Sequence, residues 1–269
     1  VCRRLLLLPG KPEVDDAVGV LVLAALRQAD DREMGELEDM VFTLPRLAAG
    51  WNPRNVALAY LKWKYRILFG PDCHPEPAQI ERYIGAVRAL WPVLDEEQRL
   101  QHRLHLNLAI ALSALQQREE LAILGEDILA GWRVDPRYES ALDRVLRQLA
   151  KLQAGGVLRR LLPALLDAPQ LSTTMTGAVI EVLAVLSRMP AAIEEHQAAA
   201  RHLSLLWSVK DFKATLPLRA HPQLAGAAQR YADFKLLREW LCHAMGLLDQ
   251  PSVRQAATSA LKDLMVFDP

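Results

Sequence analysis

Apolar residues recur at intervals of three and four along almost the whole chain, which is the spacing of one face of an α-helix. Strand-like alternation bounded by hairpin turns is almost absent. The pattern therefore predicts an all-α protein. The expected helices cover residues 13–29, 34–48, 53–69, 77–93, 96–117, 119–131, 136–154, 157–167, 172–188, 190–207, 222–233, 234–248 and 251–265.

Prolines stand where many of these apolar segments begin, as in PRNVALAYL, PAQIERYIGAV and PSVRQAATSAL. Proline suits the first helical turn, because the N–H that it lacks would be unpaired there and its φ is already close to helical. Short connections imply antiparallel neighbours. We expect a single domain over residues 1–269, with bends in the two longest irregular stretches, residues 70–77 and 210–222.

The C-terminal segment DQPSVRQAATSALKDL carries a stripe that consists largely of alanine. Small side chains let packed helices approach closely, and Val253, Leu261 and Leu264 are then expected to fill the gaps. An upstream segment shares the pattern at an offset of 29 residues. The offset aligns Pro222 with Pro251, Leu224 with Val253, Ala227 with Ala256, Ala228 with Ala257 and Ala232 with Leu261.

This proline, apolar, Ala-Ala, apolar pattern resembles the second helix of a HEAT repeat, and PSVRQAATSAL also has an arginine directly after its valine. The resemblance implies a HEAT/ARM-like α-solenoid of antiparallel helical pairs. Upstream the spacing is irregular, because Pro136 to Pro169 spans 33 residues and Pro169 to Pro222 spans 53. An irregular helical fold with one good terminal repeat, or an alanine-rich bundle, therefore stays open.

Charge and cysteine content limit the classes of partner and the cellular compartments that we expect for this protein. Lys plus Arg and Asp plus Glu each total 32, so any acidic partner, nucleic acid or lipid needs a local patch. Three scattered cysteines, Cys2, Cys73 and Cys242, argue against a disulfide framework and predict a cytoplasmic protein, or a nuclear one in a eukaryote. The apolar run 17–26 is about half of the ~20 residues that cross a bilayer, so we expect no membrane segment.

Motifs of catalysis are missing from the sequence: it has no GxSxG, GxxxxGK, GxGxxG or HExxH. We therefore expect no enzyme activity, no cofactor and no metal. His102 and His105 lie three residues apart, but no CxxC pair or acidic ligand is near, so we predict solvated histidines away from the apolar stripe. The adjacent pairs Cys73-His74 and Cys242-His243 are poor chelators.

Carboxylate pairs stand at or near expected helix starts, among them Glu96-Glu97, Glu119-Glu120 and Glu194-Glu195. There they complement the positive end of the helix dipole. Among the tryptophans, we expect Trp207 and Trp240 to pack in the core, and Trp51 and Trp132 to be more exposed at loop-helix junctions.

A basic row is the sharpest local feature. Arg137, Arg144, Arg147 and Lys151 fall within roughly 80° of one another on the expected helix, opposite its apolar face, and Arg159 and Arg160 follow on the next helix. Such a row can meet phosphates or an acidic peptide. The alternative is an ordinary solvated face, partly neutralised by Asp143 and Glu139.

A second cluster interleaves Lys62, Lys64 and Arg66 with Trp63 and Tyr65. Aromatic and basic residues together can stack nucleic-acid bases and hold their backbone. The competing interpretation is that Leu61, Tyr65 and Leu68 pack inward while the cations project outward.

Two functions follow from this reading. The first is a non-catalytic protein-protein interaction scaffold or adaptor that binds a partner protein or an acidic peptide along a helical-repeat surface. The alternative is a nucleic-acid-binding protein that resembles the HEAT-like alkylpurine DNA glycosylases, which use a basic concave face, tryptophans and a catalytic aspartate. Zero net charge weighs against the alternative, and no stretch matches a motif of that family closely enough to transfer its catalytic residues.

Overall fold

The computed structural model describes residue 24 and residues 53–167, 171–209 and 212–267. Every regular element in these ranges is a helix, so the all-α prediction is confirmed for this part of the chain. The helices expected at 13–29 and 34–48, with Cys2, Trp51 and all but one residue of the run 17–26, lie outside the described residues. No helix in the described ranges combines the length and apolar content needed to cross a bilayer.

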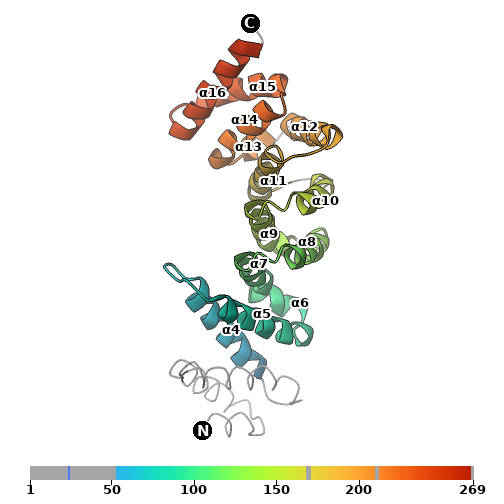
Figure 1. The fold of residues 1–269 in the computed structure, drawn as a ribbon, viewed down its shortest axis with the longest axis vertical. Coiled ribbons are helices and arrows are strands. Elements are labelled where there is room, and N and C mark those ends of the chain that lie inside the picture. The colour runs from blue at the N-terminus through green and yellow to red at the C-terminus, as the bar shows by residue number, and fades with distance from the viewer. Residues whose placement is uncertain (1–23, 25–52, 168–170, 210–211, 268–269) are drawn as a thin grey trace. The chain divides into compact units, whose positions relative to one another are not determined.

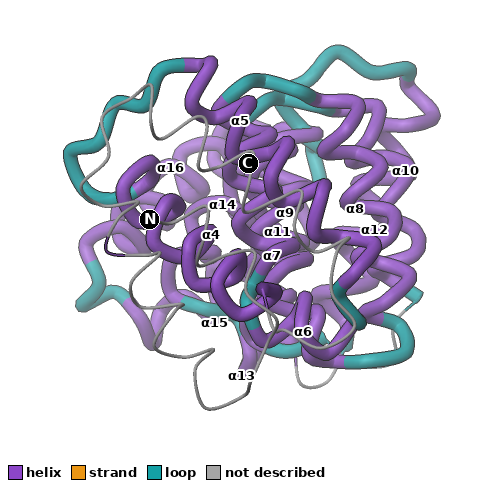
Figure 2. The backbone as a smooth tube through the Cα atoms, turned by 90° about the horizontal axis from the view of Figure 1, so that it is seen from below, coloured by secondary structure: helices purple, strands orange, loops and turns teal. Residues whose placement is uncertain are grey.

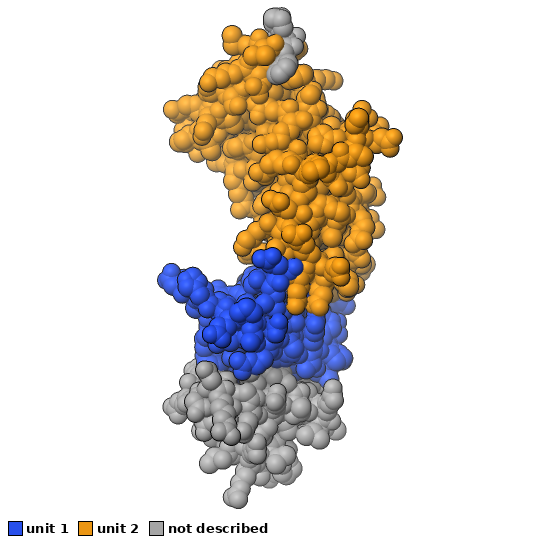
Figure 3. Space-filling model, in the orientation of Figure 1, with its two compact units in different colours: residues 1–116 blue, residues 117–269 orange. Residues whose placement is uncertain are grey.

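The chain forms two compact units, residues 1–116 and residues 117–269 (Figure 3). The irregular stretch 70–77 lies in the first unit and the stretch 210–222 in the second. A single domain with bends at these two places remains a prediction. The described helices of the first unit are α4 (Pro53–Phe69), α5 (Pro77–Leu90), η2 (Trp91–Val93), α6 (Glu96–Gln101) and α7 (Leu104–Ala114), where η marks a 3-10 helix.

In the first unit α4 packs against α5, and α5 packs against α7. The single helix expected at 96–117 is wrong, because the chain breaks at Arg103, which has a left-handed φ of 54°. The break separates two different environments. The polar segment EEQRLQ forms α6, capped by the Asp95 side chain, whereas most of the side chains of α7 are buried. The break therefore separates the polar, exposed turns of α6 from the buried turns of α7.

The second unit continues with elements that follow most of the predicted boundaries closely. An added short helix, α13, occupies a stretch expected to be irregular. The elements are α8 (Arg118–Trp132), η3 (Pro136–Tyr138), α9 (Glu139–Lys151), α10 (Gly155–Leu166), α11 (Thr173–Leu186), α12 (Ile193–Ser208), α13 (Phe212–Thr215), η4 (Leu218–Ala220), α14 (His221–Arg230), α15 (Phe234–Ala244), η5 (Met245–Leu247) and α16 (Pro251–Phe267).

These helices lie in two rows. One row runs α9, α11, α14, α16, with each helix packed against the next. The helices α8, α10 and α12 lie beside it, as two perpendicular views show (Figures 1 and 2). Within this second row α8 packs against α10, whereas α12 packs chiefly against α11 and α13. The second row is therefore less tightly packed at α12.

Alanines are buried on two helices that pack against each other, α14 and α16. Ala227 and Ala228 of α14 are buried, as are Ala257 and Ala260 of α16, as expected for small residues on packed helices. Leu261 does not fill a gap, because it is 47% exposed: it lies about 100° around the helix from the buried Ala260. The alignment of Leu261 with Ala232 is therefore wrong, and Ala232 belongs to the turn after α14.

The same tight turn occurs after α9 and after α14. Gln153 has a φ of 53° and Ala232 a φ of 52°. Ala154 N–H donates to the Leu149 carbonyl and Asp233 N–H to the Ala228 carbonyl, both at 2.9 Å. These bonds close a Schellman-type C-cap, which usually carries glycine. The same C-cap therefore ends α9 and α14, each directly before the next helix of the chain.

Polar side chains connect hairpins at a nearly constant separation in the sequence. Ser172 donates to Glu139 (2.7 Å), 33 residues away, and Trp207 donates to Glu239 (3.0 Å), 32 residues away. Gln229 donates to Ser259 at a separation of 30 residues. The starts of α9 and α11 and those of α14 and α16 are 34 and 30 residues apart, close to this separation, whereas the starts of α11 and α14 are 48 residues apart.

Candidate functional site

The helix α9 carries Arg144, Arg147 and Lys151 of the predicted row, opposite the buried Ala141, Val145 and Leu149. The fourth member, Arg137, lies before α9 on the 3-10 helix η3. Arg137, however, pairs with Asp135 at 2.8 Å. Hydrogen bonds from Arg137 lower the pKa of the Asp135 carboxyl, which keeps it charged. This end of the row is therefore already neutralised.

Arg147 connects α9 to α11. Its Nε donates to Asp143 at 2.9 Å, and its Nη1 pairs with Glu181. Burial alone lowers the pKa of Arg147, but the two carboxylates outweigh burial and raise that pKa. The guanidinium is thus held between two carboxylates and supports the packing of the two helices.

The two arginines of α10 contact different neighbours. Arg160 pairs with Glu126 of α8 at 3.1 Å, in a shallow hollow that also contains Arg118 and Glu119. Arg159 pairs with Glu195 of α12 at 3.4 Å and donates to the Pro190 carbonyl at 3.0 Å. Four of the six cations predicted for this region, Arg137, Arg147, Arg159 and Arg160, therefore have carboxylate partners.

A hollow of about 370 Å³ lies beside Lys151, which we name the α9–α11 hollow. Lys151 and Arg188, both exposed, make no ion pair among the described residues. Glu181, the carboxylate in the hollow, is engaged by Arg147. The hollow therefore has an excess of positive charge. Its lining residues are Ala150, Lys151, Gln153, Glu181, Val185, Arg188, Met189, Pro190 and Gln223.

Arg188 was not singled out from the sequence. It lies two residues beyond the end of α11, whereas Lys151 is the last residue of α9; cations near a helix C-terminus complement the helix dipole. The signal that could have found it is a cation near the C-terminus of each of these two helices. Its Nε donates to the Ala184 carbonyl at 3.1 Å, which leaves the terminal nitrogens of the guanidinium for the hollow.

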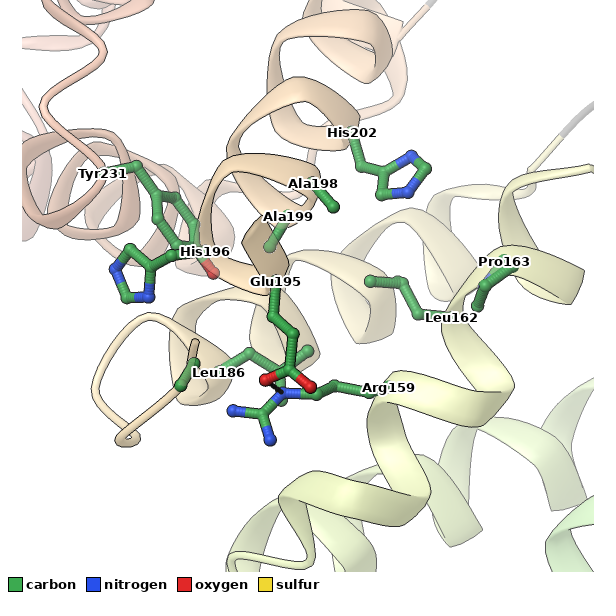
Figure 4. Close-up of a pocket in the computed structure, with 11 residues that line it drawn as sticks. Arg159, Leu162, Pro163, Leu186, Glu195, His196, Ala198, Ala199, His202 and Tyr231 are labelled. Carbon is green, nitrogen blue, oxygen red and sulfur yellow. Dashed lines mark ion pairs between the residues drawn. The ribbon is translucent and has the colours of Figure 1, made fainter. Parts of the chain in front are cut away.

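A second hollow, of about 190 Å³, separates α10 from α12, and we name it the α10–α12 hollow (Figure 4). Three small residues on the α12 side, Ala191, Ala198 and Ala199, leave the space. The ion pair of Arg159 with Glu195 stands at its edge (Figure 4). The other lining residues are Leu162, Pro163, Leu186, His196, His202 and Tyr231.

One of the polar side chains of this second hollow is already hydrogen-bonded. Tyr231 donates its hydroxyl to the Leu183 carbonyl at 3.1 Å, and burial raises the pKa of Tyr231 to about 12. The ring of His196 lies edge-on to Tyr231, with 4.8 Å between the centroids. Arg159, His196 and His202 supply the side-chain nitrogen atoms among the lining residues.

The basic cluster on α4 belongs to the first unit. Lys62 and Arg66 are exposed, while Lys64 is half-buried. Leu61 and Leu68 are buried as expected. Tyr65 is half-buried and packs on Tyr83 of α5 with 6.2 Å between the ring centroids, so this aromatic ring is used in packing. Trp63 in turn contacts Tyr60 at 5.7 Å.

The prediction of two solvated histidines on one helix is wrong. His102 is exposed at the end of α6, but His105 is buried on α7, edge-on to Trp91 at 4.7 Å. Burial and the nearby Arg99 lower the pKa of His105 to about 4. Burial therefore favours the neutral form of the His105 imidazole. The interval of three residues does not place the two histidines on one helix face, because the helix breaks at Arg103 between them. Among the described residues no group of three metal-ligating side chains is found.

Aromatic side chains pack together in the C-terminal half of the second unit. Trp207 and Trp240 are buried as predicted, and Trp132 is half-buried. His221, which the sequence did not single out, accepts a hydrogen bond from Trp240 and stacks on His243, with 5.7 Å between the rings. Burial and His243 lower the pKa of His221 to about 4. Cys73 and Cys242 are exposed thiols.

The carboxylate pairs lie where the helix dipole favours them. The first turns of α6, α8 and α12 contain Glu96-Glu97, Glu119-Glu120 and Glu194-Glu195 respectively, so this prediction is confirmed. Glu195 has a second contact, the ion pair with Arg159.

Comparison with known proteins does not assign the chain to a family. No protein-family model matches it, and neither a curated protein nor a solved structure matches it. The resemblance to HEAT repeats therefore remains a prediction. Helices packed against one another, in a manner compatible with a helical repeat, are what the structure contains.

Proposed function

We propose that this chain is a non-catalytic binding module that holds an acidic segment of a partner protein on its second unit. The observation that carries the proposal is the α9–α11 hollow. Lys151 and Arg188 stand at its rim, and its carboxylate, Glu181, is neutralised by Arg147. An acidic side chain placed there meets positive charge without displacing an existing ion pair.

The helices packed against one another are compatible with a helical repeat, and the repeat architecture that we propose suits this function. Stacked hairpins offer extended surfaces on which contacts are spread over several repeats, and no reactive residue is required. The polar connections between hairpins span 30 to 33 residues. Helix-turn-helix repeats of the tetratricopeptide class have a period of ~34 residues and HEAT repeats one of ~40–47. We propose a HEAT/ARM-like solenoid of antiparallel helical pairs whose period varies along the chain, because the starts of α9, α11, α14 and α16 are 34, 48 and 30 residues apart.

The buried histidines support a non-catalytic function. His105 and His221 are the two histidines that the fold buries among the described residues, and each contacts a tryptophan ring. Their low pKa values keep them neutral near pH 7, where they act as packing groups. Exposed thiols at Cys73 and Cys242 support a reducing compartment, so we propose a cytoplasmic protein, or a nuclear one in a eukaryote.

Nucleic-acid binding, including a DNA glycosylase-like activity, is the alternative. Lys62 and Arg66 favour it, because they are exposed on α4 beside the half-buried Trp63. Arg147 weighs against it, because this cation of the basic row is held between Asp143 and Glu181 and a phosphate would have to displace both.

Charge reversal tests the proposal. We expect Lys151→Glu combined with Arg188→Glu to weaken binding of a fluorescent acidic peptide by about tenfold or more in an anisotropy titration. Lys235→Glu combined with Lys262→Glu is the matched control, because both are exposed lysines, on α15 and α16, and the pair changes the net charge by the same amount. If the Lys151→Glu, Arg188→Glu double variant binds the peptide as tightly as the control does, the α9–α11 hollow is not part of the binding surface.

A further inference from the structure

The two hollows of the second unit share a border. Met189 and Pro190 line the α9–α11 hollow, and the next residue, Ala191, lines the α10–α12 hollow. Arg159 reaches this border, because it donates to the Pro190 carbonyl at 3.0 Å. A segment of a partner that crosses the connection between α11 and α12 can therefore contact both hollows.

The α10–α12 hollow has the size and the surface for one apolar side chain. Its volume is about 190 Å³, and a cavity of ~150 Å³ lined by apolar side chains is large enough to hold benzene. Leu162, Leu186 and Ala199 supply apolar surface. A leucine or phenylalanine side chain fits this volume, whereas alanine would leave most of it empty.

The polar edge of the same hollow favours a carboxylate. Arg159 and Glu195 pair at 3.4 Å, with side chains that are 29% and 48% exposed. An ion pair of this length and exposure contributes little stability, so a carboxylate of a partner can replace Glu195 at small cost. The hydrogen bond to Pro190 keeps the guanidinium in place during such an exchange.

We infer that the two hollows form one bipartite site for an acidic segment of a partner protein that carries a single bulky apolar side chain. The apolar anchor enters the α10–α12 hollow. Carboxylates on the same segment meet Arg159 at the border and Lys151 and Arg188 in the α9–α11 hollow. The inference rests on the proposed function and specifies the sequence class of the partner.

Short fluorescent peptides with glutamates on both sides of one variable position test this inference by anisotropy. We expect leucine or phenylalanine at that position to bind the wild-type chain about tenfold more tightly than alanine. Ala198→Leu extends a side chain into the α10–α12 hollow and should remove the preference. Gln197→Leu adds the same side chain at an exposed position outside the hollow and should preserve it.

Glu195→Gln provides a test that does not depend on filling the hollow. It removes the carboxylate that competes for Arg159, so we expect the leucine peptide to bind about twofold or more tighter. Circular dichroism of each variant establishes that it is folded.

Each result separates the inference from the function on which it rests. If leucine and alanine peptides bind equally, or if Ala198→Leu leaves the preference intact in a folded protein, the anchor site is overturned while acidic-segment binding stands. Weaker binding by Glu195→Gln removes the assigned role of Arg159. If none of the acidic peptides binds the wild-type chain, both the anchor site and the proposed function are overturned.

Discussion

Trp240 donates its indole N–H to Nδ1 of His221 at 3.3 Å, deep in the C-terminal part of the second unit. The bond requires that Nδ1 carry no proton, so the contact exists only with a neutral imidazole. The ring of His243 stacks on the ring of His221, with an angle of 9° between the two planes. Two imidazoles and an indole therefore connect α14 to α15.

Acid should destabilise the second unit through His221. Its pKa is about 4 in the folded chain against an ordinary value of 6.5, so the unfolded chain binds the proton more readily. Stability is therefore complete above about pH 6.5 and falls as the pH is lowered towards 4, by up to roughly 3 kcal/mol at about 1.4 kcal/mol per pKa unit.

Urea unfolding at several pH values measures this effect. His221→Phe should flatten the decline between pH 6.5 and 4, while His74→Gln, at an exposed position, should leave it unchanged. A decline that is equally steep in His221→Phe and in the wild type would contradict the assignment, and His105 would then be the next group to replace.

Glycine should stabilise the turn between α14 and α15. Ala232 has a φ of 52°, a conformation that costs an L-residue with a Cβ about 1 kcal/mol or more. We expect Ala232→Gly to raise the free energy of unfolding by roughly 0.5–1 kcal/mol. Ala200→Gly, inside α12, should lower it by about 1 kcal/mol. A loss of stability in Ala232→Gly would show that the turn is not strained.

Arg147 should be a structural residue rather than a binding residue. It lies between Asp143 and Glu181, so Arg147→Ala leaves two partly buried carboxylates without their cation. We expect it to lower the free energy of unfolding by about 1–3 kcal/mol, and Arg144→Ala, on the same face, to change it by no more than ~0.5 kcal/mol. Thermal unfolding of both variants distinguishes the two roles, and equal small effects would refute the structural one.

The alanine contact between α14 and α16 should not accept a larger side chain. Ala257 is 4% exposed at this contact, so Ala257→Leu should destabilise the chain by about 1–3 kcal/mol through overpacking. Gln255→Leu, exposed on the same helix, serves as the control and should change stability by ~0.5 kcal/mol at most. Chemical denaturation measures both. Full stability of Ala257→Leu would mean that the helices are not closely packed there.

Local features of the fold were readable from the sequence. Prolines marked the starts of α4, α5 and α16, and the alanines of α14 and α16 marked their contact. The spacing of apolar residues indicates whether a segment is helical, which explains these results. It does not indicate where a polar helix ends and a buried one begins, so the break at Arg103 was missed.

The site was less predictable, because its partners come from different hairpins. The sequence marked Lys151 as a candidate, yet Arg188 joins it only through the packing of α11 against α9. Glu181 and Glu195 neutralise Arg147 and Arg159 across 34 and 36 residues respectively. No local pattern specifies which residues meet at such separations. The α10–α12 hollow was unpredictable for the same reason, because its lining residues come from several helices.

Side-by-side titration of the wild-type chain with an acidic peptide and with duplex DNA, over a range of salt concentrations, tests the central claim most directly. The account predicts saturable peptide binding that weakens with salt and is weaker by about tenfold or more in Lys151→Glu combined with Arg188→Glu, together with weak binding of DNA. Tight DNA binding with a steep salt dependence, and no saturable binding of the acidic peptide, would contradict it.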